Sequence, residues 1–358
     1  MQANSYVCDL QPYQPGKPIE EVVREFGHSA DQIVKLASNE NPLGMGTKAQ
    51  EALKQAAQEG HRYPEQYGLV QALAQYYGLQ DTQIVIGNGS NDVLDLIART
   101  FLDGGDEAIM SQYAFVVYEL ATRSTGAIPV VVPVTGYGHD LQAMLAAITA
   151  QTKIIWIANP NNPTGTFIPY DQIETFISRV PDHIVVVLDE AYYEYLPPQE
   201  RANSVQWLHR FPNLILVRTF SKIHGLAGLR IGYGLMHDTT ASLLNRVRQP
   251  FNGNRLGLAA ATAALQDTAF LRQSYDNNQM GRKQLTTGLR DMGVAPIKGQ
   301  GNFITFQIPQ AAAIVKKMLE RGVIVRPLAA YGMTDHIRVT IGTKAENAQF
   351  LATLKSSM

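Results

Sequence analysis

Short apolar runs recur through the middle of the chain, and each is followed directly by polar residues. Runs of this length are typical of buried strands, whereas the segments between them are long enough for helices. Strands that alternate with helices join through right-handed crossovers, which sets the strands parallel in one sheet. We therefore predict an α/β fold with a mostly parallel sheet, whose strands include residues 84–86, 107–110, 154–158, 184–188 and 214–217.

The pattern changes on both sides of this region. The first 30 residues are rich in proline, which predicts an arm with one short helix at residues 19–26. Residues 255–292 are alanine-rich and predict one long helix, and the alternating pattern beyond them indicates a smaller α/β unit with strands near residues 303–307, 323–325 and 336–341. The predicted organisation is an N-terminal arm of residues 1–30, a large domain of residues 31–250 whose N-terminal segment contributes to the small domain, and a linking helix with a C-terminal small domain over residues 251–358.

Composition narrows the class of protein. The net charge of -1 and the pI near 6.7 give no reason to expect nucleic acid or an anionic membrane as a partner. Cys8 is the only cysteine, which excludes an internal disulfide and fits a reducing compartment. The N-terminus lacks the apolar run of a signal peptide, and no stretch approaches the length of a membrane span. We expect a soluble, cytoplasmic protein.

Polar residues with useful chemistry follow three of the expected strands. In chain order they are Asn-Pro-Asn-Asn-Pro-Thr-Gly at residues 159–165, Asp-Glu-Ala-Tyr at residues 189–192, and a segment that contains Lys222. The carboxyl ends of parallel strands meet at one edge of a sheet, where folds of this kind bind their ligands. One crevice can therefore collect all three segments.

Lys222 stands between an expected buried strand and a glycine-rich bend, near Thr219, Ser221 and Arg230. Burial lowers the pKa of a lysine ammonium toward the free amine, which attacks carbonyl groups. Two hydroxyls and a guanidinium suit a phosphate. The same pattern also fits a solvated loop lysine followed by an ordinary turn. A site for the cofactor pyridoxal phosphate needs at least these two features, an amine that forms an imine and a group of donors that binds a phosphate.

Further side chains suit the ring of this cofactor. A buried Asp189 favours a protonated pyridine nitrogen, because opposite charges attract strongly at low dielectric, and the protonated ring is an electron sink. Tyr192 and Asn162 are candidates to bond the phenolic oxygen of the ring, and Tyr113 to stack on it. Each has an ordinary alternative, namely a helix cap for Asp189, core packing for the two tyrosines and a turn for Asn162.

Motifs of other catalytic classes are missing from the sequence. The bend at residues 87–92 opens a helix whose first amides suit an anion, but it lacks the third glycine of the dinucleotide fingerprint, which disfavours a nicotinamide dehydrogenase. The eight histidines form no ligand-spaced pair on a helix, and neither a serine-hydrolase elbow nor a P-loop is present. The pyridoxal-phosphate interpretation is therefore the one that remains.

Three motifs occur in a characteristic order: Asn-Pro-x-Asn-Pro-Thr-Gly, Asp-x-x-Tyr, and Ser-Lys with an arginine eight residues after the lysine. Together they resemble the fold-type I pyridoxal-phosphate aminotransferases of class I/II, and the resemblance covers nearly the whole chain. Pro-Tyr-Gln-Pro-Gly at residues 12–16, Asn-Glu-Asn-Pro at 39–42 and Arg-Tyr-Pro at 62–64 are similar to the histidinol-phosphate aminotransferase family within that class. Ile-His at residues 223–224 and Ser-Gln at 111–112 depart from the commoner versions near the ring, which bears on substrate preference.

The resemblance implies a role for each candidate residue. Lys222 would form the imine with the cofactor and Asp189 would pair with the pyridine nitrogen. A partner subunit would supply Tyr63 to the cofactor phosphate, which implies a homodimer. Arg338 would bind the substrate anion, with Arg326 as a helper or, equally, as a surface ion-pair residue. The remaining implied contacts are Asn162 and Tyr192 to the phenolic oxygen, and Ser90, Asn91, Thr219, Ser221 and Arg230 to the cofactor phosphate. Tyr13 and Asn39 are further candidates to bind the substrate.

The reaction that the resemblance implies is the conversion of L-histidinol phosphate and 2-oxoglutarate to imidazole acetol phosphate and L-glutamate, a step of histidine biosynthesis. An aromatic amino-acid aminotransferase for phenylalanine or tyrosine, or a phosphothreonine-type decarboxylase, would share every cofactor residue. A non-catalytic pyridoxal-phosphate-binding regulator would need an added DNA-binding module, for which we expect neither spare length nor a basic helix pair. Product analysis separates these alternatives, because only a decarboxylase releases carbon dioxide without needing 2-oxoglutarate.

Overall fold

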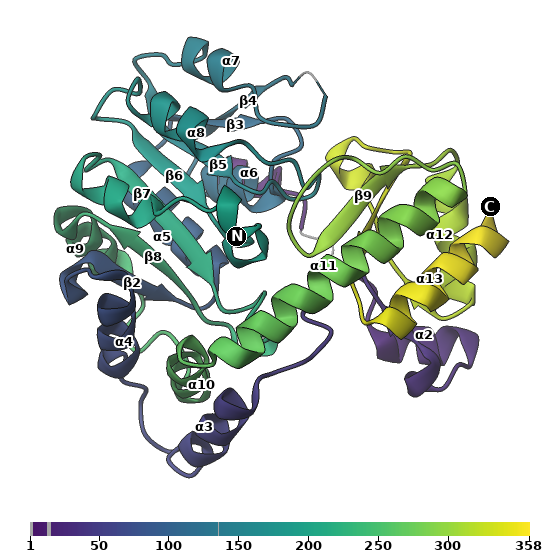
Figure 1. Ribbon diagram of the computed structural model, residues 1–358. Coiled ribbons are helices and arrows are strands. Elements are labelled where there is room, and N and C mark those ends of the chain that lie inside the picture. Colours follow the sequence, from purple (N-terminus) through teal and green to yellow (C-terminus); the bar gives the residue numbers. More distant parts are fainter. Residues whose placement is uncertain (1–2, 13–15, 135) are drawn as a thin grey trace.

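A computed structural model describes residues 3–12, 16–134 and 136–358. The molecule has a larger and a smaller lobe, and the long helix α11 (Thr268–Asp291) runs from one to the other (Figure 1). A seven-stranded sheet forms the centre of the large lobe, and a three-stranded sheet lies in the small lobe. The predicted α/β class, with a large, mostly parallel sheet and a smaller α/β part, is confirmed. The boundaries between residues 30 and 31 and between 250 and 251 stay predictions.

In the large sheet the strands follow the order β2-β8-β7-β6-β5-β3-β4. Among these seven, β8 runs antiparallel to both of its neighbours, and all the other pairs are parallel. The central strands β5 and β6 are buried on both faces, which explains their continuous apolar runs. The strands are β2 (Ile84–Gly87), β3 (Glu107–Ser111), β4 (Ile128–Val132), β5 (Thr152–Ala158), β6 (Val185–Asp189), β7 (Leu214–Thr219) and β8 (Gly232–Met236).

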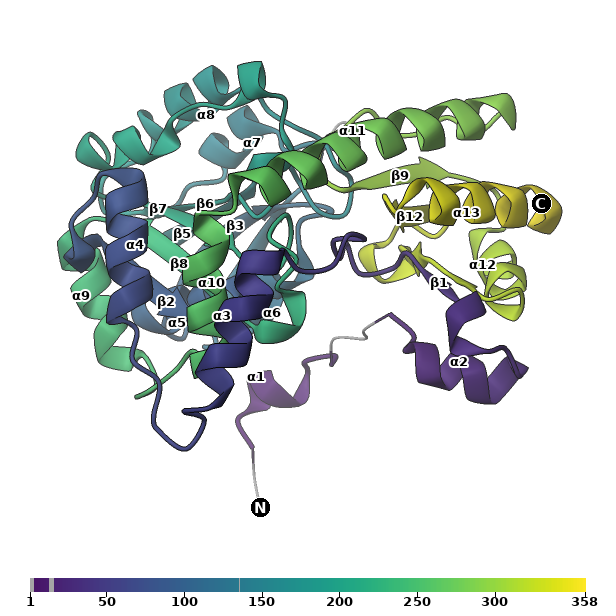
Figure 2. The same cartoon turned by 60° about the horizontal axis from the view of Figure 1, so that its bottom comes forward.

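Helices cover both faces of this sheet, and alternate residues of its strands pack into two separate apolar clusters (Figures 1 and 2). One cluster includes residues of α4, α7, α8 and α10, with α3 packed against α10. The other includes residues of α5 and α6, and of α9. The helices are α3 (Thr47–Ala57), α4 (Tyr67–Tyr77), α5 (Ser90–Phe101), α6 (Val116–Ser124), α7 (Leu141–Ala146), α8 (Tyr170–Ile177), α9 (Asp238–Val247) and α10 (Arg255–Leu265).

The small lobe packs α12, α13 and part of α11 around a third apolar cluster. Its antiparallel sheet has the order β11-β12-β9, and β1 pairs with β10 in a separate parallel ribbon. The strands expected near residues 303–307, 323–325 and 336–341 are present, although the second pairs with β1 and not with the other two. The elements of the small lobe are α2 (Ile19–Phe26), β1 (Val34–Lys35), β9 (Phe303–Gln307), α12 (Ala311–Glu320), β10 (Val323–Ile324), β11 (Arg326–Pro327), β12 (His336–Thr340) and α13 (Lys344–Ser357). Helix α1 (Ser5–Cys8) contacts α6 of the large lobe.

Three features differ from the sequence expectations. Strand β8 was not predicted, because its sequence Gly-Tyr-Gly-Leu-Met lacks a continuous apolar run. Strand β4 lies at the edge of the sheet, is partly exposed and contains Pro129, so it also lacks the pattern of a buried strand. The helix expected over residues 255–292 is broken at Gln266, because Asp267 caps a new helix by accepting the N–H of Phe270 at 3.2 Å.

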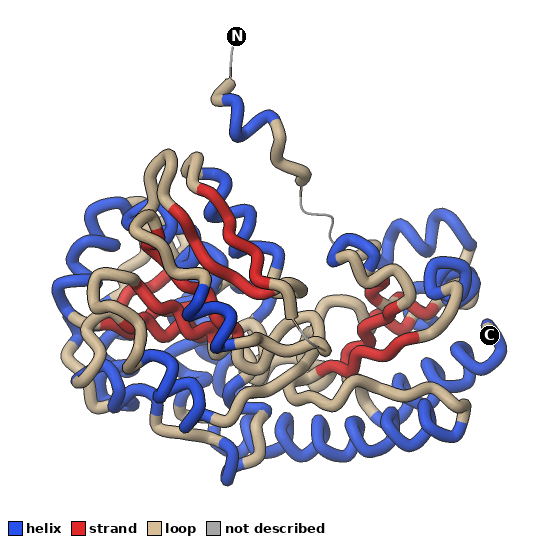
Figure 3. Tube along the Cα trace, turned by 90° about the horizontal axis from the view of Figure 1, so that it is seen from above, coloured by secondary structure: helices blue, strands red, loops and turns tan. Residues whose placement is uncertain are grey.

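This architecture brings the carboxyl ends of β5, β6 and β7 toward the small lobe. Seen from above, the strands form two groups with helices around each, and loops of both lobes meet between them (Figure 3). Residues 36–39 lie at this junction, since Leu36 and Asn39 both bond to Thr340 of β12. Within the described ranges, no helix has both the length and the apolar character needed to cross a membrane.

Candidate active site

The polar segments that follow β5, β6 and β7 line one cavity of about 470 Å³. Both lobes contribute to its walls, because β11 and β12 supply side chains from the small lobe. Parallel strands of an open sheet place their ligand site at this edge. The candidate residues that line the cavity are Asn39, Ser90, Asn91, Asn162, Asp189, Tyr192, Thr219, Ser221, Lys222, Arg230, Arg326 and Arg338.

Lys222 follows β7 and is half-buried at the wall of the cavity. Its Nζ donates to the carbonyl oxygen of Ser38 at 3.5 Å and lies 5.6 Å from the centre of the Tyr192 ring. The lysine therefore stands between the segment from the small-lobe junction and the end of β6. A flexible four-carbon stem at this position lets the amine reach a ligand in the cavity.

Two glycines shape a concave site for an anion at the start of α5. A Cβ on Gly89 would collide with the guanidinium of Arg230, and one on Gly232 would collide with the backbone of Ser90. Because neither glycine carries a Cβ, Arg230 can lie against the start of the helix. There its Nη1 donates to Ser221 Oγ at 3.3 Å. The first amides of a helix carry protons without intrahelical acceptors, and the dipole there is positive. This donor set fits a phosphate.

Asp189 ends β6 and is buried, with 6% of its surface exposed. Burial raises the pKa of its carboxyl group to about 6, although two hydrogen bonds favour the charged form. These bonds come from the hydroxyl of Tyr118 at 2.9 Å and from the backbone N–H of Ala191 at 3.1 Å. A cation placed next to this carboxylate would lower its pKa again, so the site is suited to a protonated nitrogen base.

Two arginines from adjacent strands of the small lobe reach the opposite wall. Arg338 of β12 and Arg326 of β11 are register partners, and both line the cavity. The Nη1 of Arg338 donates to Asn162 Oδ1 at 2.5 Å, and its Nη2 donates to the carbonyl oxygen of Ala37 at 2.8 Å. Guanidinium groups so placed can bind a carboxylate or a phosphate with two parallel hydrogen bonds.

Two candidate residues of the described ranges, Tyr113 and Tyr63, are not brought to this cavity. Tyr113 has a left-handed backbone (φ 59°), and its ring lies 6.3 Å from that of Tyr137 rather than among the lining residues. Tyr63 is 75% exposed and stacks on Phe251 with 4.3 Å between ring centres. Tyr13 lies outside the described residues.

Sequence reasoning did not identify three aromatic residues that line the cavity. Phe115 and Tyr118 lie three positions apart at the start of α6, and Tyr331 lies in a short turn after β11. Phe115 and Tyr118 could have been found from their spacing, because two residues three positions apart on a helix share one face and both follow an expected strand. Tyr331 could not have been found in this way, because no motif in the neighbouring sequence indicates that it lies near β6.

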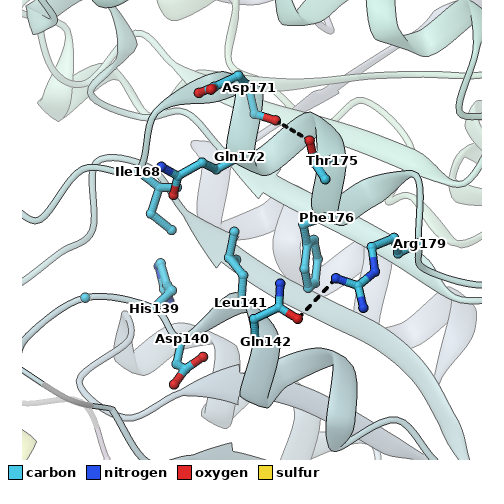
Figure 4. Close-up of a pocket in the computed structure, with 11 residues that line it drawn as sticks. His139, Asp140, Leu141, Gln142, Ile168, Asp171, Gln172, Thr175, Phe176 and Arg179 are labelled. Carbon is cyan, nitrogen blue, oxygen red and sulfur yellow. Dashed lines mark hydrogen bonds between the residues drawn. The ribbon is translucent and has the colours of Figure 1, made fainter.

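A second cavity, of about 520 Å³, lies between α7 and α8 on the large lobe (Figure 4). The hydrogen bonds drawn there join residues of the cavity wall to one another, such as the bond from Arg179 Nη1 to Gln142 Oε1 at 3.1 Å. None of the candidate residues that line the first cavity lines this one. Among the described residues, no group of three or more His, Cys, Asp or Glu side chains could hold a metal ion.

Comparison with known proteins identifies the class. The model of the family "Aminotransferase class I and II" matches residues 31–354, so the chain belongs to this family. It is 54% identical over 357 residues to histidinol-phosphate aminotransferase 1 of Dechloromonas aromatica (strain RCB), with 100% of this chain and 99% of that protein covered. It is 52% identical over 355 residues to histidinol-phosphate aminotransferase 2 of Nitrosospira multiformis, with 98% and 91% covered. The resemblance seen in the motifs is thereby confirmed.

Solved structures agree with this assignment. The crystal structure of histidinol-phosphate aminotransferase from Sinorhizobium meliloti in complex with pyridoxal-5'-phosphate superposes with a TM-score of 0.91 at 30% identity. The superposition covers 99% of this chain and 97% of that one. An aspartate aminotransferase from Thermus thermophilus with maleate superposes with a TM-score of 0.86 at 22% identity, which shows the shared fold.

Proposed function

We propose that the chain is a pyridoxal-phosphate-dependent enzyme that transfers the amino group of L-histidinol phosphate to 2-oxoglutarate, giving imidazole acetol phosphate and L-glutamate. The observation that carries the proposal is the convergence of Lys222, Asp189 and Arg230 on one cavity with Arg338 on its far wall. Relatives about half identical over almost the full chain, named histidinol-phosphate aminotransferases, support the choice of substrate. The proposed place of the reaction is histidine biosynthesis in the cytoplasm.

The residues of the cavity fit pyridoxal phosphate. The site at the start of α5, with Ser90, Asn91, Thr219, Ser221 and Arg230, would hold its phosphate. Asp189 would face the pyridine nitrogen, and Asn162 and Tyr192 the phenolic oxygen. Tyr113 stays a candidate for stacking, although Phe115 is the aromatic residue of that segment that lines the cavity. When bound, the cofactor supplies a carbonyl carbon that condenses with amines and a ring that accepts electrons.

Lys222 and Asp189 would divide the acid–base work between them. The neutral Nζ of Lys222 would take the proton from the reacting carbon of the substrate and return it on the other side of the reaction, as a general base and then a general acid. The Asp189 carboxylate would keep a proton on the ring nitrogen through its opposite charge. Tyr118 would hold that carboxylate in place, because its hydroxyl donates to Oδ2.

The substrate anions would bind at the wall formed by the small lobe. Histidinol phosphate carries a phosphate where glutamate carries a carboxylate, so one site must serve both. Arg338, with Arg326 beside it, offers a fork that pairs with either group. Asn39 lines the same wall, and Tyr13, which lies outside the described residues, is proposed as a further donor to the phosphate.

A homodimer is proposed as the assembled form. Tyr63 and Phe251 form an exposed stacked pair, and Tyr67 nearby in sequence is also exposed. Exposed aromatic residues of this kind are enriched at protein interfaces. In the proposed dimer Tyr63 reaches the cofactor phosphate of the neighbouring subunit, so each site needs both chains.

A substrate panel tests the proposed reaction. Purified protein with pyridoxal phosphate and 2-oxoglutarate is given L-histidinol phosphate, phenylalanine, tyrosine or O-phosphothreonine, and glutamate and carbon dioxide are both measured. We expect the highest kcat/KM with histidinol phosphate, no carbon dioxide, and no turnover without 2-oxoglutarate. A far higher kcat/KM for phenylalanine or tyrosine, or carbon dioxide release, would overturn the proposed substrate.

A further inference from the structure

Residues 36–39 form a strap that connects β12 of the small lobe to the cavity. Its backbone is bonded at every residue, and three of the five bonds join it to Arg338 or Thr340 of β12. The bonds are Thr340 N–H to the carbonyl of Leu36 at 2.8 Å, Arg338 Nη2 to the carbonyl of Ala37 at 2.8 Å, Lys222 Nζ to the carbonyl of Ser38 at 3.5 Å, the backbone N–H of Asn39 to Thr340 Oγ1 at 2.9 Å, and Asn302 Nδ2 to the carbonyl of Asn39 at 2.9 Å.

Asn39 is buried, with 1% of its surface exposed, and its backbone is left-handed at φ 55°. The hydroxyl of Thr340 accepts the backbone N–H of Asn39 and lies 3.2 Å from its Oδ1. A backbone N–H can only donate, so the hydroxyl proton is left to bond Oδ1. Thr340 therefore determines which end of the Asn39 amide faces β12, and the NH₂ group must point the other way.

That NH₂ group donates to the hydroxyl of Tyr192, with 2.9 Å between Nδ2 and the phenol oxygen. Tyr192 is buried against Phe303, with ring centres 5.2 Å apart, and lines the cavity. Because its oxygen accepts from Asn39, the proton of the hydroxyl is kept for an acceptor in the cavity. With the opposite orientation of the amide, Oδ1 would accept this proton and withdraw it from the cavity.

We propose that Asn39, oriented by Thr340, is a positioning residue that makes the Tyr192 hydroxyl a donor toward the cavity. This role goes beyond a contact with substrate and rests on the proposed function, in which Tyr192 bonds the phenolic oxygen of the cofactor. Arg338 and Thr340 lie two residues apart and share one face of β12. The same strand therefore holds the substrate anion and sets the direction of a hydrogen bond to the cofactor.

The test measures the visible absorption of the bound cofactor as a function of pH. A hydroxyl that donates to the phenolic oxygen stabilises its anionic form and lowers the pH at the midpoint of this titration. Asn39→Gly removes the amide and keeps the left-handed backbone at no steric cost. Thr340→Val keeps the shape and removes the hydroxyl that orients the amide. We expect both variants to raise the midpoint by about half to one pH unit, the size expected for one net hydrogen bond.

Three further variants make the result specific. Tyr192→Phe should raise the midpoint at least as much, and adding Asn39→Gly to it should produce no further shift, because the two residues act through one hydroxyl. Tyr193→Phe is the matched control, since its hydroxyl donates to the carbonyl of Ala202 and should leave the midpoint unchanged. Thermal unfolding of each variant separates a shifted midpoint from a loss of folded protein.

Two outcomes would overturn the inference in distinguishable ways. If Tyr192→Phe shifts the midpoint while Asn39→Gly and Thr340→Val do not, Asn39 does not position Tyr192, and the proposed function is untouched. Additive shifts in the double variant would lead to the same conclusion. If Tyr192→Phe leaves the midpoint unchanged, the proposed role of Tyr192 in cofactor binding fails, and the positioning role fails with it.

Discussion

At the scale of single residues, the proposed chemistry depends first on Lys222. Lys222→Ala should lower transamination by at least about 10³-fold, because no other group would move the proton. Cofactor should still bind through the site at the start of α5. Steady-state rates and absorption spectra measure the two effects. Lys48→Ala is the control, since Lys48 is exposed and donates to the carbonyl of Gln266.

A chemical experiment locates the reactive lysine independently. Borohydride reduces an imine to a stable amine, so the cofactor should become fixed to the peptide that contains Lys222. Peptide mapping that finds the label on another lysine contradicts the assignment, whatever the activity of the variants.

The raised pKa of Asp189 predicts a pH dependence of stability in the cofactor-free protein. Burial raises this pKa from an ordinary value near 4 to about 6, so the folded state binds the proton more tightly than the unfolded state. The stabilising contribution is therefore full below pH of about 4 and is lost as the pH rises through about 6, on the order of 2–3 kcal/mol in all.

Urea unfolding at pH 4 and pH 7 measures this change. Asp189→Asn should show a smaller loss of stability between the two values than the wild type, because the amide does not titrate. Asp171→Asn, at an exposed position of α8, should behave as the wild type. Equal losses in the wild type and Asp189→Asn would mean that the buried carboxyl titrates with an ordinary pKa.

The sequence predicted which residues line the cavity where a charged residue follows an apolar run. It failed where the local backbone conformation determines which side chain lines the cavity. Asp189 directly follows one apolar run and Lys222 comes shortly after the end of another, so both were expected at the sheet edge, and both line the cavity. Phe115 lines the cavity and Tyr113 does not, and the left-handed backbone at Tyr113 is a feature that no residue pattern reveals. The roles proposed for these residues stay predictions.

At the scale of elements, the start of α5 depends on the two glycines that crowd Arg230. Gly89→Ala should weaken cofactor binding by about tenfold or more, because the new methyl would displace the guanidinium and the backbone at φ 82° is strained for alanine. Gly105→Ala is the control, since Gly105 has φ 92° and a Cβ added there would meet no other atom within 4 Å. Titration with pyridoxal phosphate and the Tm of both variants distinguish lost affinity from backbone strain.

Equal effects of the two alanine substitutions would contradict the proposed importance of the contact between Arg230 and α5. If Gly105→Ala and Gly89→Ala lower the Tm equally and leave cofactor affinity at the wild-type value, the approach of Arg230 to α5 does not matter for binding. Strain alone then explains the effect of the alanine.

Strands were predictable from sequence where both faces are buried. β5, β6 and β7 have continuous apolar runs, because each face packs against helices. β8 lies between β2 and β7 but carries glycines, and the one at Gly232 is required by contact with Ser90 across space. A constraint imposed by a residue far away in the sequence leaves no local pattern.

At the scale of the whole molecule, the two lobes are tied together at several points around the cavity. Arg282 of α11 donates to the carbonyl groups of Gly299, Gly301 and Phe303, and Gln300 donates its N–H to the carbonyl of Gly165 in the large lobe. The loop that carries Asn162 is thereby fixed to the small lobe. This closeness was not predictable from the sequence, because Gly165 and Gln300 lie more than 100 positions apart.

The proposed dimer makes a prediction that only two chains together can fulfil. In a mixture of Lys222→Ala and Tyr63→Phe protomers, a hybrid dimer has one site with both Lys222 and the partner's tyrosine. With random pairing about half of the dimers are hybrids and half of their sites are intact, so about a quarter of all sites should regain activity. The control mixture contains Tyr67→Phe in place of Tyr63→Phe. Tyr67 is also exposed, and the loss of its hydroxyl should not limit activity.

Activity is compared before and after the two variants are mixed, unfolded and refolded together, and the hybrid is identified by a charge tag on one chain. Recovery above the sum of the separate variants, in proportion to the amount of hybrid, supports a site built from two subunits. Tyr63 stacks on Phe251 at the surface of its own chain and does not line its own cavity, so a contribution within one chain would need that pair to separate. Hybrids that form without any recovery would therefore place Tyr63 outside the partner's site, and its exposed ring would then serve the subunit contact alone.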